Sequence, residues 1–359
     1  CLQDCSVQHK LFPLRITGLM GRAYVDDTGR ATFTGMKGRL GTAALEVIAG
    51  QAAPGGAGRL ALTLRVAGLR FNDELRGALA PTWQKVWDEV RPSGEGVAEY
   101  QFTGNPEKPD QPAQRISIEP SDGGFCYRRL PLAVSDITRG KVAFDQDGSG
   151  TITNIQGKVQ GKTVQIGGKV TVGPGGSVLQ IDVAADELTL NPELRAALPP
   201  EWQQMWDGLK PVGKVGVVGA GVINMQKGEW QSFRLDATLK GCEATWHKLP
   251  IPLKGLRGRF DYADGTVTLT DVVGECAVAD QVRLSGRIFK KGVGADRVQI
   301  VAQNARFTPE FFAALPPEAR KALETMALKG MADLDLTVTT PEKGDVTQCF
   351  GLVRLREAS

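Results

Sequence analysis

From Phe71 to Pro92 the chain reads FNDELRGALAPTWQKVWDEVRP, and from Leu190 to Pro211 it reads LNPELRAALPPEWQQMWDGLKP. Aligned without gaps, the two segments share an Asn, a Leu-Arg pair, a Pro and two Trp residues. A third copy, FTPEFFAALPPEARKALETM, begins at Phe307 and has Ala319 and Leu323 in place of the Trp pair. Recurrence of this length and regularity indicates a tandem repeat.

Each copy of this motif is typical of a short helix. A residue suited to an N-cap begins it, and a Glu in the first turn complements the free N–H groups there. A proline follows inside the motif, and we expect it to break or restart the helix because proline cannot donate in a helix interior. Trp83 and Trp87 lie one turn apart and form an apolar ridge, which we interpret as a core plug rather than a ligand-stacking platform. The N-caps are Asn72, Asn191 and Thr308, the prolines are Pro81, Pro200 and Pro317, and the second Trp pair is Trp202 and Trp206.

Between the helical motifs, apolar and polar residues alternate over stretches that are separated by Asp/Gly turns. The stretches read HKLFPLRITGLMGRAYVDDTGRATFTGMKGRLG from His9, RRLPLAVSDITRGKVAFDQDGSGTITNIQGKVQG from Arg128 and HKLPIPLKGLRGRFDYADGTVTLTDVVGECAV from His247. This pattern predicts consecutive antiparallel hairpins, and Asp264-Gly265 is the clearest two-residue turn.

The expected fold class is therefore mainly β: three tandem repeats of an antiparallel β-meander plus one helix, which form a continuous curled sheet, a half-open groove. One helix per unit cannot cover a meander of about six strands, whose apolar face must be buried. The sheet can curl on itself, meet a second sheet or cover an apolar ligand. The expected boundaries are residues 1–10 for the end of a preceding unit, 11–126 for repeat 1, 127–242 for repeat 2, 243–349 for repeat 3, and 350–359 for the start of a following unit.

The strand before each helical motif alternates most clearly, and we expect its apolar residues to line the groove. An ordinary sheet core is the other interpretation of these positions. The candidates are Leu62, Leu64, Val66, Leu179, Ile181, Val183, Val298 and Ile300.

The composition excludes several classes of protein. A net charge of +3 lacks the basic excess of a nucleic-acid binder. Two His residues leave little for acid–base or metal chemistry. No apolar run reaches the roughly 18 residues of a membrane-spanning helix. We expect neither an enzyme nor a cofactor.

The repeated meander with one LPPE-containing helix resembles the AsmA-like proteins of the bacterial envelope, which are similar in architecture to TamB and to the eukaryotic bridge-like lipid transfer proteins. The resemblance covers essentially the whole chain. It implies a β-groove with an apolar floor that conducts phospholipid acyl chains between two membranes, in the periplasm or cell envelope. It also implies a monomeric rod, held near a membrane through parts outside this chain. The family has no catalytic residues, so none are assigned.

Two motifs imitate ligand sites. DQDGSG, from Asp145 to Gly150, begins like a calcium loop, but the twelfth position, which needs a bidentate carboxylate, is Gln156. GVVGAGVIN, from Gly216 to Asn224, imitates a dinucleotide-binding loop but leads into an apparent strand instead of a helix. We interpret the first as a hairpin turn and the second as Gly-rich β-sequence.

Cysteine and histidine do not form a metal site. Cys5 with His9 and Cys242 with His247 occupy matching places in different repeats, about 55 Å apart at about 4.8 Å per strand, whereas zinc needs four ligands around one point. The separation of the repeats also forbids disulfides between cysteines that occupy matching places in different repeats, because the two Cα atoms of a disulfide must lie close together. We interpret Cys5, Cys126, Cys242 and Cys349 as small buried hydrophobic residues at a repeated core position.

Two alternatives to a lipid conduit stay open: a structural or adhesive β-repeat rod with a closed core, and an outer-membrane protein assembly factor whose sheet edge templates a client strand. The start of the chain also allows two interpretations. Cys1 is either a lipidated N-terminus or a cut end, and the repeats favour a segment of a longer protein.

Overall fold

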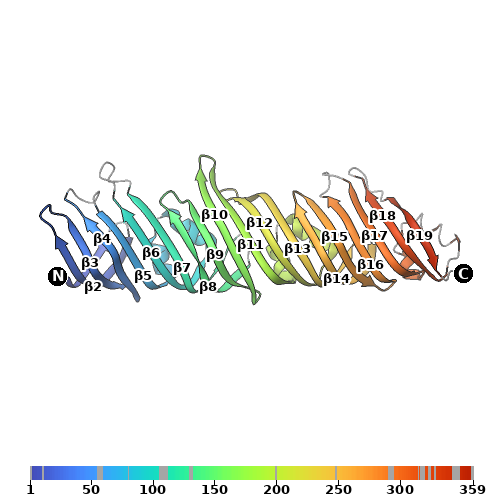
Figure 1. The fold of residues 1–359 in the computed structure, drawn as a ribbon, viewed down its shortest axis with the longest axis horizontal. Coiled ribbons are helices and arrows are strands. Elements are labelled where there is room, and N and C mark those ends of the chain that lie inside the picture. The colour runs from blue at the N-terminus through green and yellow to red at the C-terminus, as the bar shows by residue number, and fades with distance from the viewer. Residues whose placement is uncertain are drawn as a thin grey trace. The chain divides into compact units, whose positions relative to one another are not determined.

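The structure, a computed structural model, is shown in Figure 1. It describes residues 2–9, 12–54, 60–79, 81–104, 112–128, 132–198, 200–246, 249–289, 295–313, 315, 320–321, 325–326, 329–341 and 348–356. Within these residues the chain forms nineteen strands, assigned to one sheet, and five short helices. The expected mainly β class, an open antiparallel meander, is confirmed.

The chain divides into two compact units: unit 1 comprises Cys1–Asp182 and Val222–Gln231, and unit 2 comprises Val183–Gly221 and Ser232–Ser359. The strands of unit 1 are β1 (Leu2–His9), β2 (Phe12–Val25), β3 (Ala31–Leu40), β4 (Ala43–Ala52), β5 (Leu60–Arg70), β6 (Pro92–Thr103), β7 (Ala113–Cys126), β8 (Ala133–Asp145), β9 (Gly150–Val159) and β10 (Lys162–Gly173). β11 (Gly176–Leu190), β12 (Gly213–Asn224) and β13 (Glu229–Trp246) have residues in both units, and unit 2 continues with β14 (Leu249–Ala263), β15 (Thr266–Cys276), β16 (Ala279–Phe289), β17 (Asp296–Arg306), β18 (Met331–Thr340) and β19 (Gln348–Arg356). From β1 to β10 in unit 1 and from β13 to β19 in unit 2, each strand pairs antiparallel with the next one in sequence.

The motif that we expected to form one helix forms a helix pair in its first two copies. The helices are α1 (Asp73–Ala78), α2 (Pro81–Val90), α3 (Pro192–Ala197), α4 (Pro200–Leu209) and α5 (Pro309–Ala313). Pro81 and Pro200 begin the second helix of each pair, where the N–H that proline lacks would have no partner. Pro317, Ala319 and Leu323 lie outside the described residues. No helix in the described part of the chain is long and apolar enough to cross a membrane.

The expected local signals at helix starts and turns are confirmed. The backbone N–H groups of Leu75, Leu194 and Phe311 donate to the side chains of Asn72 (3.0 Å), Asn191 (2.9 Å) and Thr308 (3.3 Å), respectively. Asp264 and Gly265 have φ values of 49° and 81° and connect β14 to β15 as a two-residue hairpin, which requires positive φ at both positions.

A series of β-bulges bends the strands. In β14, Gly255 has a φ of 61° and precedes the buried Leu256, and the pairing with β15 shifts beside it. In β15, Asp271 has a φ of 47° and precedes Val272, which is 2% exposed. A bulge adds one residue to one strand, raises the local twist and bends the strand. The same combination of positive φ and a following buried side chain recurs at Gly18-Leu19, Gly35-Met36, Asp136-Ile137, Asn154-Ile155, Gly241-Cys242 and Asn304-Ala305.

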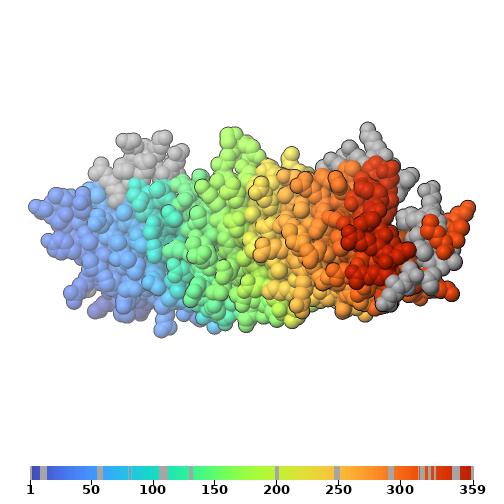
Figure 2. Space-filling model, turned by 45° about the vertical axis from the view of Figure 1, so that its right-hand side comes forward, coloured from blue at the N-terminus to red at the C-terminus, as the bar shows by residue number. Residues whose placement is uncertain are grey.

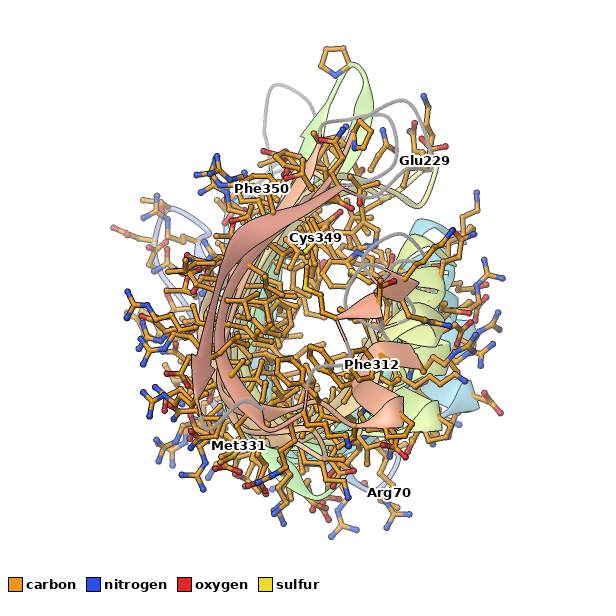
Figure 3. All side chains as sticks on the ribbon, turned by 90° about the vertical axis from the view of Figure 1, so that its right-hand side faces the viewer. Arg70, Glu229, Phe312, Met331, Cys349 and Phe350 are labelled. Atoms are coloured by element: carbon orange, nitrogen blue, oxygen red, sulfur yellow. The ribbon has the colours of Figure 1, made fainter. Side chains whose placement is uncertain are left out.

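The two faces of the sheet differ. In Figure 3 the strands of unit 2 that are nearest to the viewer curve around the side on which Phe312 and the helices of that unit lie. In each unit we call the side on which that unit's own helices pack the inner face. It carries Leu64 and Val66 of β5 in unit 1, and in unit 2 it carries Val298 and Ile300 of β17, which share a cluster with Phe311 of α5. The opposite side is the outer face. In Figure 1 the helices of each unit lie behind that unit's own strands, so each unit is drawn with its outer face toward the reader.

The outer face carries charged side chains. Lys37, Glu46, Arg65 and Glu99 lie directly opposite one another on β3, β4, β5 and β6, with alternating sign. Opposite charges in cross-strand pairs favour this register, although exposed pairs add little stability. Figure 2 shows this side of unit 1, from blue to green, as a closely packed surface.

Two of the expected repeat boundaries fall inside strands. The boundary after residue 242 lies within β13, and the boundary after residue 349 lies within β19. Residues 350–356 therefore continue a strand that begins at Gln348. The division of the chain into three repeats stays a prediction.

Candidate functional site

The eight groove candidates lie on β5, β11 and β17, the strands that precede the helical motifs. Their alternation with polar residues along each strand directs them to one face. The half-buried candidates are Leu62, Leu64, Ile181 and Val183, and the buried ones are Val66, Leu179, Val298 and Ile300.

The structure does not bring these eight residues together at one point. Seven of them are distributed among three described apolar clusters, and Val183 belongs to none of these three. In unit 1, the three candidates of β5 pack against a cluster formed by Leu19, Met36, Leu40, Ala43, Leu45 and Val47. Leu179 and Ile181 belong to a second cluster with Val170 and Ile223. In unit 2, Val298 and Ile300 belong to a larger cluster that extends from Cys242 to Leu334.

A row of half-buried side chains connects the two clusters of unit 1. The pairing places Leu64 opposite Tyr100, Tyr100 opposite Ile116, and Ile116 opposite Phe144. Residues directly opposite one another in a sheet share a face, so this row continues the inner face from β5 to β8. Leu64 packs against the first cluster and Phe144 against the second. We call these four residues the inner strip.

Sequence reasoning did not identify Tyr100, Ile116 or Phe144 as site residues. The signal that could have found them is the alternation of Ala98, Tyr100 and Phe102 in β6, which matches that of β5. It does not reveal the register, which depends on how β5, β6, β7 and β8 pair across the sheet.

The helix pairs cover part of the inner face. The Trp83 ring of α2 lies edge-on to Phe144 of β8, with ring centroids 5.1 Å apart. In unit 2, Trp202 of α4 lies 4.2 Å from Tyr262 of β14 and 5.4 Å from Phe233 of β13, measured between centroids. The interpretation of the Trp ridge as a core plug is confirmed for these two residues.

An ion pair connects the two helices of each pair. Arg76 donates to both carboxylate oxygens of Asp88, at 2.6 and 2.8 Å, and Arg195 donates in the same way to Asp207, at 2.7 and 2.6 Å. These hydrogen bonds hold the pKa values of Asp88 and Asp207 below the ordinary range. Because both pairs are solvent-exposed, their main effect is to fix the geometry of the helix pair over the sheet.

The third copy holds its helix in another way. Phe312 stands where the second copy has Arg195, and it packs with Phe307 and Phe311 at centroid distances of 6.1 and 5.7 Å. Arg320 donates to the backbone carbonyls of Phe312 and of the residue after it, at 2.8 and 2.6 Å. An aromatic cluster therefore replaces the ion pair at this end of the chain.

The two motifs that imitate ligand sites are structural. Asp147 accepts hydrogen bonds from the backbone N–H and hydroxyl of Ser149, at 2.8 and 2.6 Å, which lower the pKa of Asp147 and close the hairpin between β8 and β9. The Gly-rich run from 216 to 224 lies in β12. Both interpretations are confirmed.

The cysteine interpretation is partly wrong. Cys242 is 2% exposed, as expected for a small core residue, but Cys349 is exposed as the second residue of β19. Equal spacing along the chain does not give the two cysteines equal places in their strands. Among the described residues, no group of three or more His, Cys, Asp or Glu side chains could hold a metal ion. His247 and the side chain of His9 lie outside the described part.

A polar depression of about 190 Å³ lies on the outer face of unit 1. It is lined by Glu99, Gln101, Arg115, Ser117 and Lys141. Arg115 lies 3.8 Å from Asp145, and Lys141 lies 3.2 Å from Glu119, so both cations already have carboxylate partners. This lining offers no surface to a hydrocarbon.

No family model, curated protein or solved structure matches the chain. The candidate site therefore rests on the geometry of the inner face. What this face can do chemically is to bind apolar groups over part-exposed aliphatic and aromatic side chains.

Proposed function

We propose that the protein is a non-catalytic component of the cell envelope whose inner sheet face binds phospholipid acyl chains and conducts them between membranes. The observation that carries the proposal is the inner strip, whose four large side chains stay half-buried although α2 covers part of the same face. Apolar surface that is removed from water is worth about 25 cal/mol per Å². An acyl chain laid along the strip gains this free energy.

The distribution of charge also supports a hydrocarbon ligand. The described charges of β3 to β6 lie on the outer face, so an acyl chain on the inner strip does not desolvate them. The resemblance to AsmA-like proteins favours the periplasm, a monomeric chain and contact with membranes through parts of the protein outside these residues. The competing proposal, a rod with a closed core, needs the inner strip to be covered by protein.

Aspartate on the inner face tests this function. Leu64→Asp and Ile181→Asp are suitable because both side chains are half-buried, whereas Ile300 is only 8% exposed and tolerates a charge less well. Thr63→Asp and Gln180→Asp are matched controls, since each adds the same charge to the outer face of the same strand. Circular dichroism establishes that each variant keeps its sheet.

The readouts are phospholipid per chain, from mass spectrometry of organic extracts, and the rate of phospholipid transfer between vesicles. We expect the inner-face variants to lose both properties and the outer-face controls to keep them. If folded inner-face variants carry and transfer lipid as the unmodified protein does, the inner face is not the conduit.

A further inference from the structure

A polar pair lies next to the inner strip in unit 1. The phenol of Tyr100 donates a hydrogen bond to the side-chain carbonyl of Gln114 at 3.1 Å. Tyr100 lies opposite Leu64, while Gln114 lies opposite Phe102, which in turn lies opposite Leu62. Both polar side chains are therefore on the inner face, among the groove candidates of β5.

The pair has hydrogen-bonding capacity that the protein does not use. When Tyr100 donates to Gln114, the Gln114 amide retains two N–H donors and the phenolic oxygen retains acceptor capacity. In the described part of the chain, neither side chain makes a further hydrogen bond. Both are half-buried, and burial raises the pKa of Tyr100, so the phenol stays neutral.

The corresponding positions of unit 2 lack this pair. Leu336 lies opposite Ile300, and Cys349 lies opposite Val338, so Leu336 and Cys349 take the places of Tyr100 and Gln114 in the third copy. The sheet thus forms there without a polar pair. The hydrogen bond is therefore not a requirement of the meander itself.

We propose that Gln114, held in place by the phenol of Tyr100, binds the ester carbonyl of an acyl lipid whose hydrocarbon chain lies along the inner strip. This inference rests on the proposed function and assigns a position to the polar end of the ligand. The free N–H groups of Gln114 donate to the ester carbonyl, while Leu64, Ile116 and Phe144 contact the chain. Unit 1 then distinguishes an ester lipid from a plain hydrocarbon and holds it in one orientation.

The test compares two fluorescent probes of equal length, a pyrene-labelled fatty acid methyl ester and a pyrene-labelled alkane, titrated into the purified full chain. We expect the unmodified protein to bind the ester more tightly. Gln114→Leu should lower the ester affinity about five-fold, the loss of one hydrogen bond, and the double variant with Tyr100→Phe about 5- to 30-fold. The affinity for the alkane should not fall. Gln101→Leu, on the outer face of β6, is the control and should leave both affinities unchanged.

If Gln114→Leu does not fold, Gln114→Glu replaces it, because a carboxylate keeps the acceptor for Tyr100 but has no N–H to donate. Ester affinity that is unchanged in the folded variants, while the alkane still binds, overturns this inference and leaves the proposed function intact. Failure of the unmodified protein to bind either probe overturns the proposed function and this inference together.

Discussion

Alanine at Gly258 tests how the sheet bends. Gly258 of β14 has a φ of 137°, and a Cβ atom there would lie 2.6 Å from the carbonyl oxygen of Asp271 and 2.7 Å from the Cα of Val272. Both neighbours are backbone atoms of β15 and cannot move aside alone. Gly255, on the same strand, also has a positive φ of 61°, but the nearest atom to its Cβ would be a Glu275 carboxylate oxygen at 3.9 Å.

These two glycines separate backbone strain from steric overlap. Gly255→Ala adds only the strain of a left-handed backbone, about 1–2 kcal/mol. Gly258→Ala adds backbone strain of about 1–3 kcal/mol. It also forces β14 away from β15, and this steric overlap costs about 1–3 kcal/mol more, as at other overpacked sites. We therefore expect Gly258→Ala to lower the free energy of unfolding by about 2–6 kcal/mol, and by about 2 kcal/mol more than Gly255→Ala.

The assay is urea denaturation followed by circular dichroism, with the unmodified chain measured alongside. We expect the transition of unit 2 to move to lower urea in both variants, and further in Gly258→Ala. Equal shifts, or a Gly258→Ala protein as stable as the unmodified one, would refute the argument that close strand contact at the bulges demands glycine.

Three further predictions concern charged side chains. Because Arg76 lowers the pKa of Asp88, the stability that this carboxylate contributes is present above the ordinary Asp pKa and is lost as pH falls through the lowered value. Thermal melts from pH 5 to 2 should therefore fall less steeply for Asp88→Asn than for the unmodified protein, and parallel curves would contradict this. A hydrogen bond with Asp236 raises the pKa of Asp261, so the stability that protonated Asp261 contributes is present below the ordinary Asp pKa and is lost as pH rises through the raised value. Asp261→Asn should therefore melt at a higher temperature than the unmodified protein at pH 7 but not at pH 3. A lower melting temperature at pH 7 would show that the two carboxylates do not repel. Arg320→Ala removes two hydrogen bonds to helix carbonyls and should lower the free energy of unfolding in urea by about 1–2 kcal/mol. An unchanged free energy of unfolding would mean that water replaces these two hydrogen bonds.

Features of the fold that depend on neighbouring residues in sequence could be predicted. Asn72 begins a helix because its side chain accepts from an N–H three residues later, and Asp264-Gly265 turns a hairpin because both residues tolerate positive φ. Pro81 was expected to break or restart a helix, and it begins the second helix of a pair. Each of these features is decided within a few residues.

The bulges could not be located in the same way. Asp136 and Asn304 look like ordinary strand residues in the sequence, yet both have positive φ values, of 50° and 53°. A bulge depends on how two strands are paired, and that pairing is a property of the whole sheet. The hydrogen bond between Tyr100 and Gln114 was missed for the same reason, because it joins neighbouring strands through two residues that are 14 positions apart in sequence.

The contacts of the aromatic ridge were only partly predictable. Helical spacing indicated that Trp83 packs on something apolar, but not that its partner is Phe144 of β8. The error at Cys349 has a related origin, since spacing in sequence was taken to mean an equal place in the sheet. The order of side chains in the inner strip follows from strand register, which the alternation within a single strand does not give.

The most direct test of the lipid-binding claim is the phospholipid content of the purified, unmodified chain after gel filtration, from quantitative mass spectrometry of its organic extract. If the inner strip holds acyl chains, the protein should retain about one phospholipid per chain or more, or acquire that amount from vesicles. A protein that carries no phospholipid and takes up none from vesicles would contradict the claim and favour a rod with a closed core.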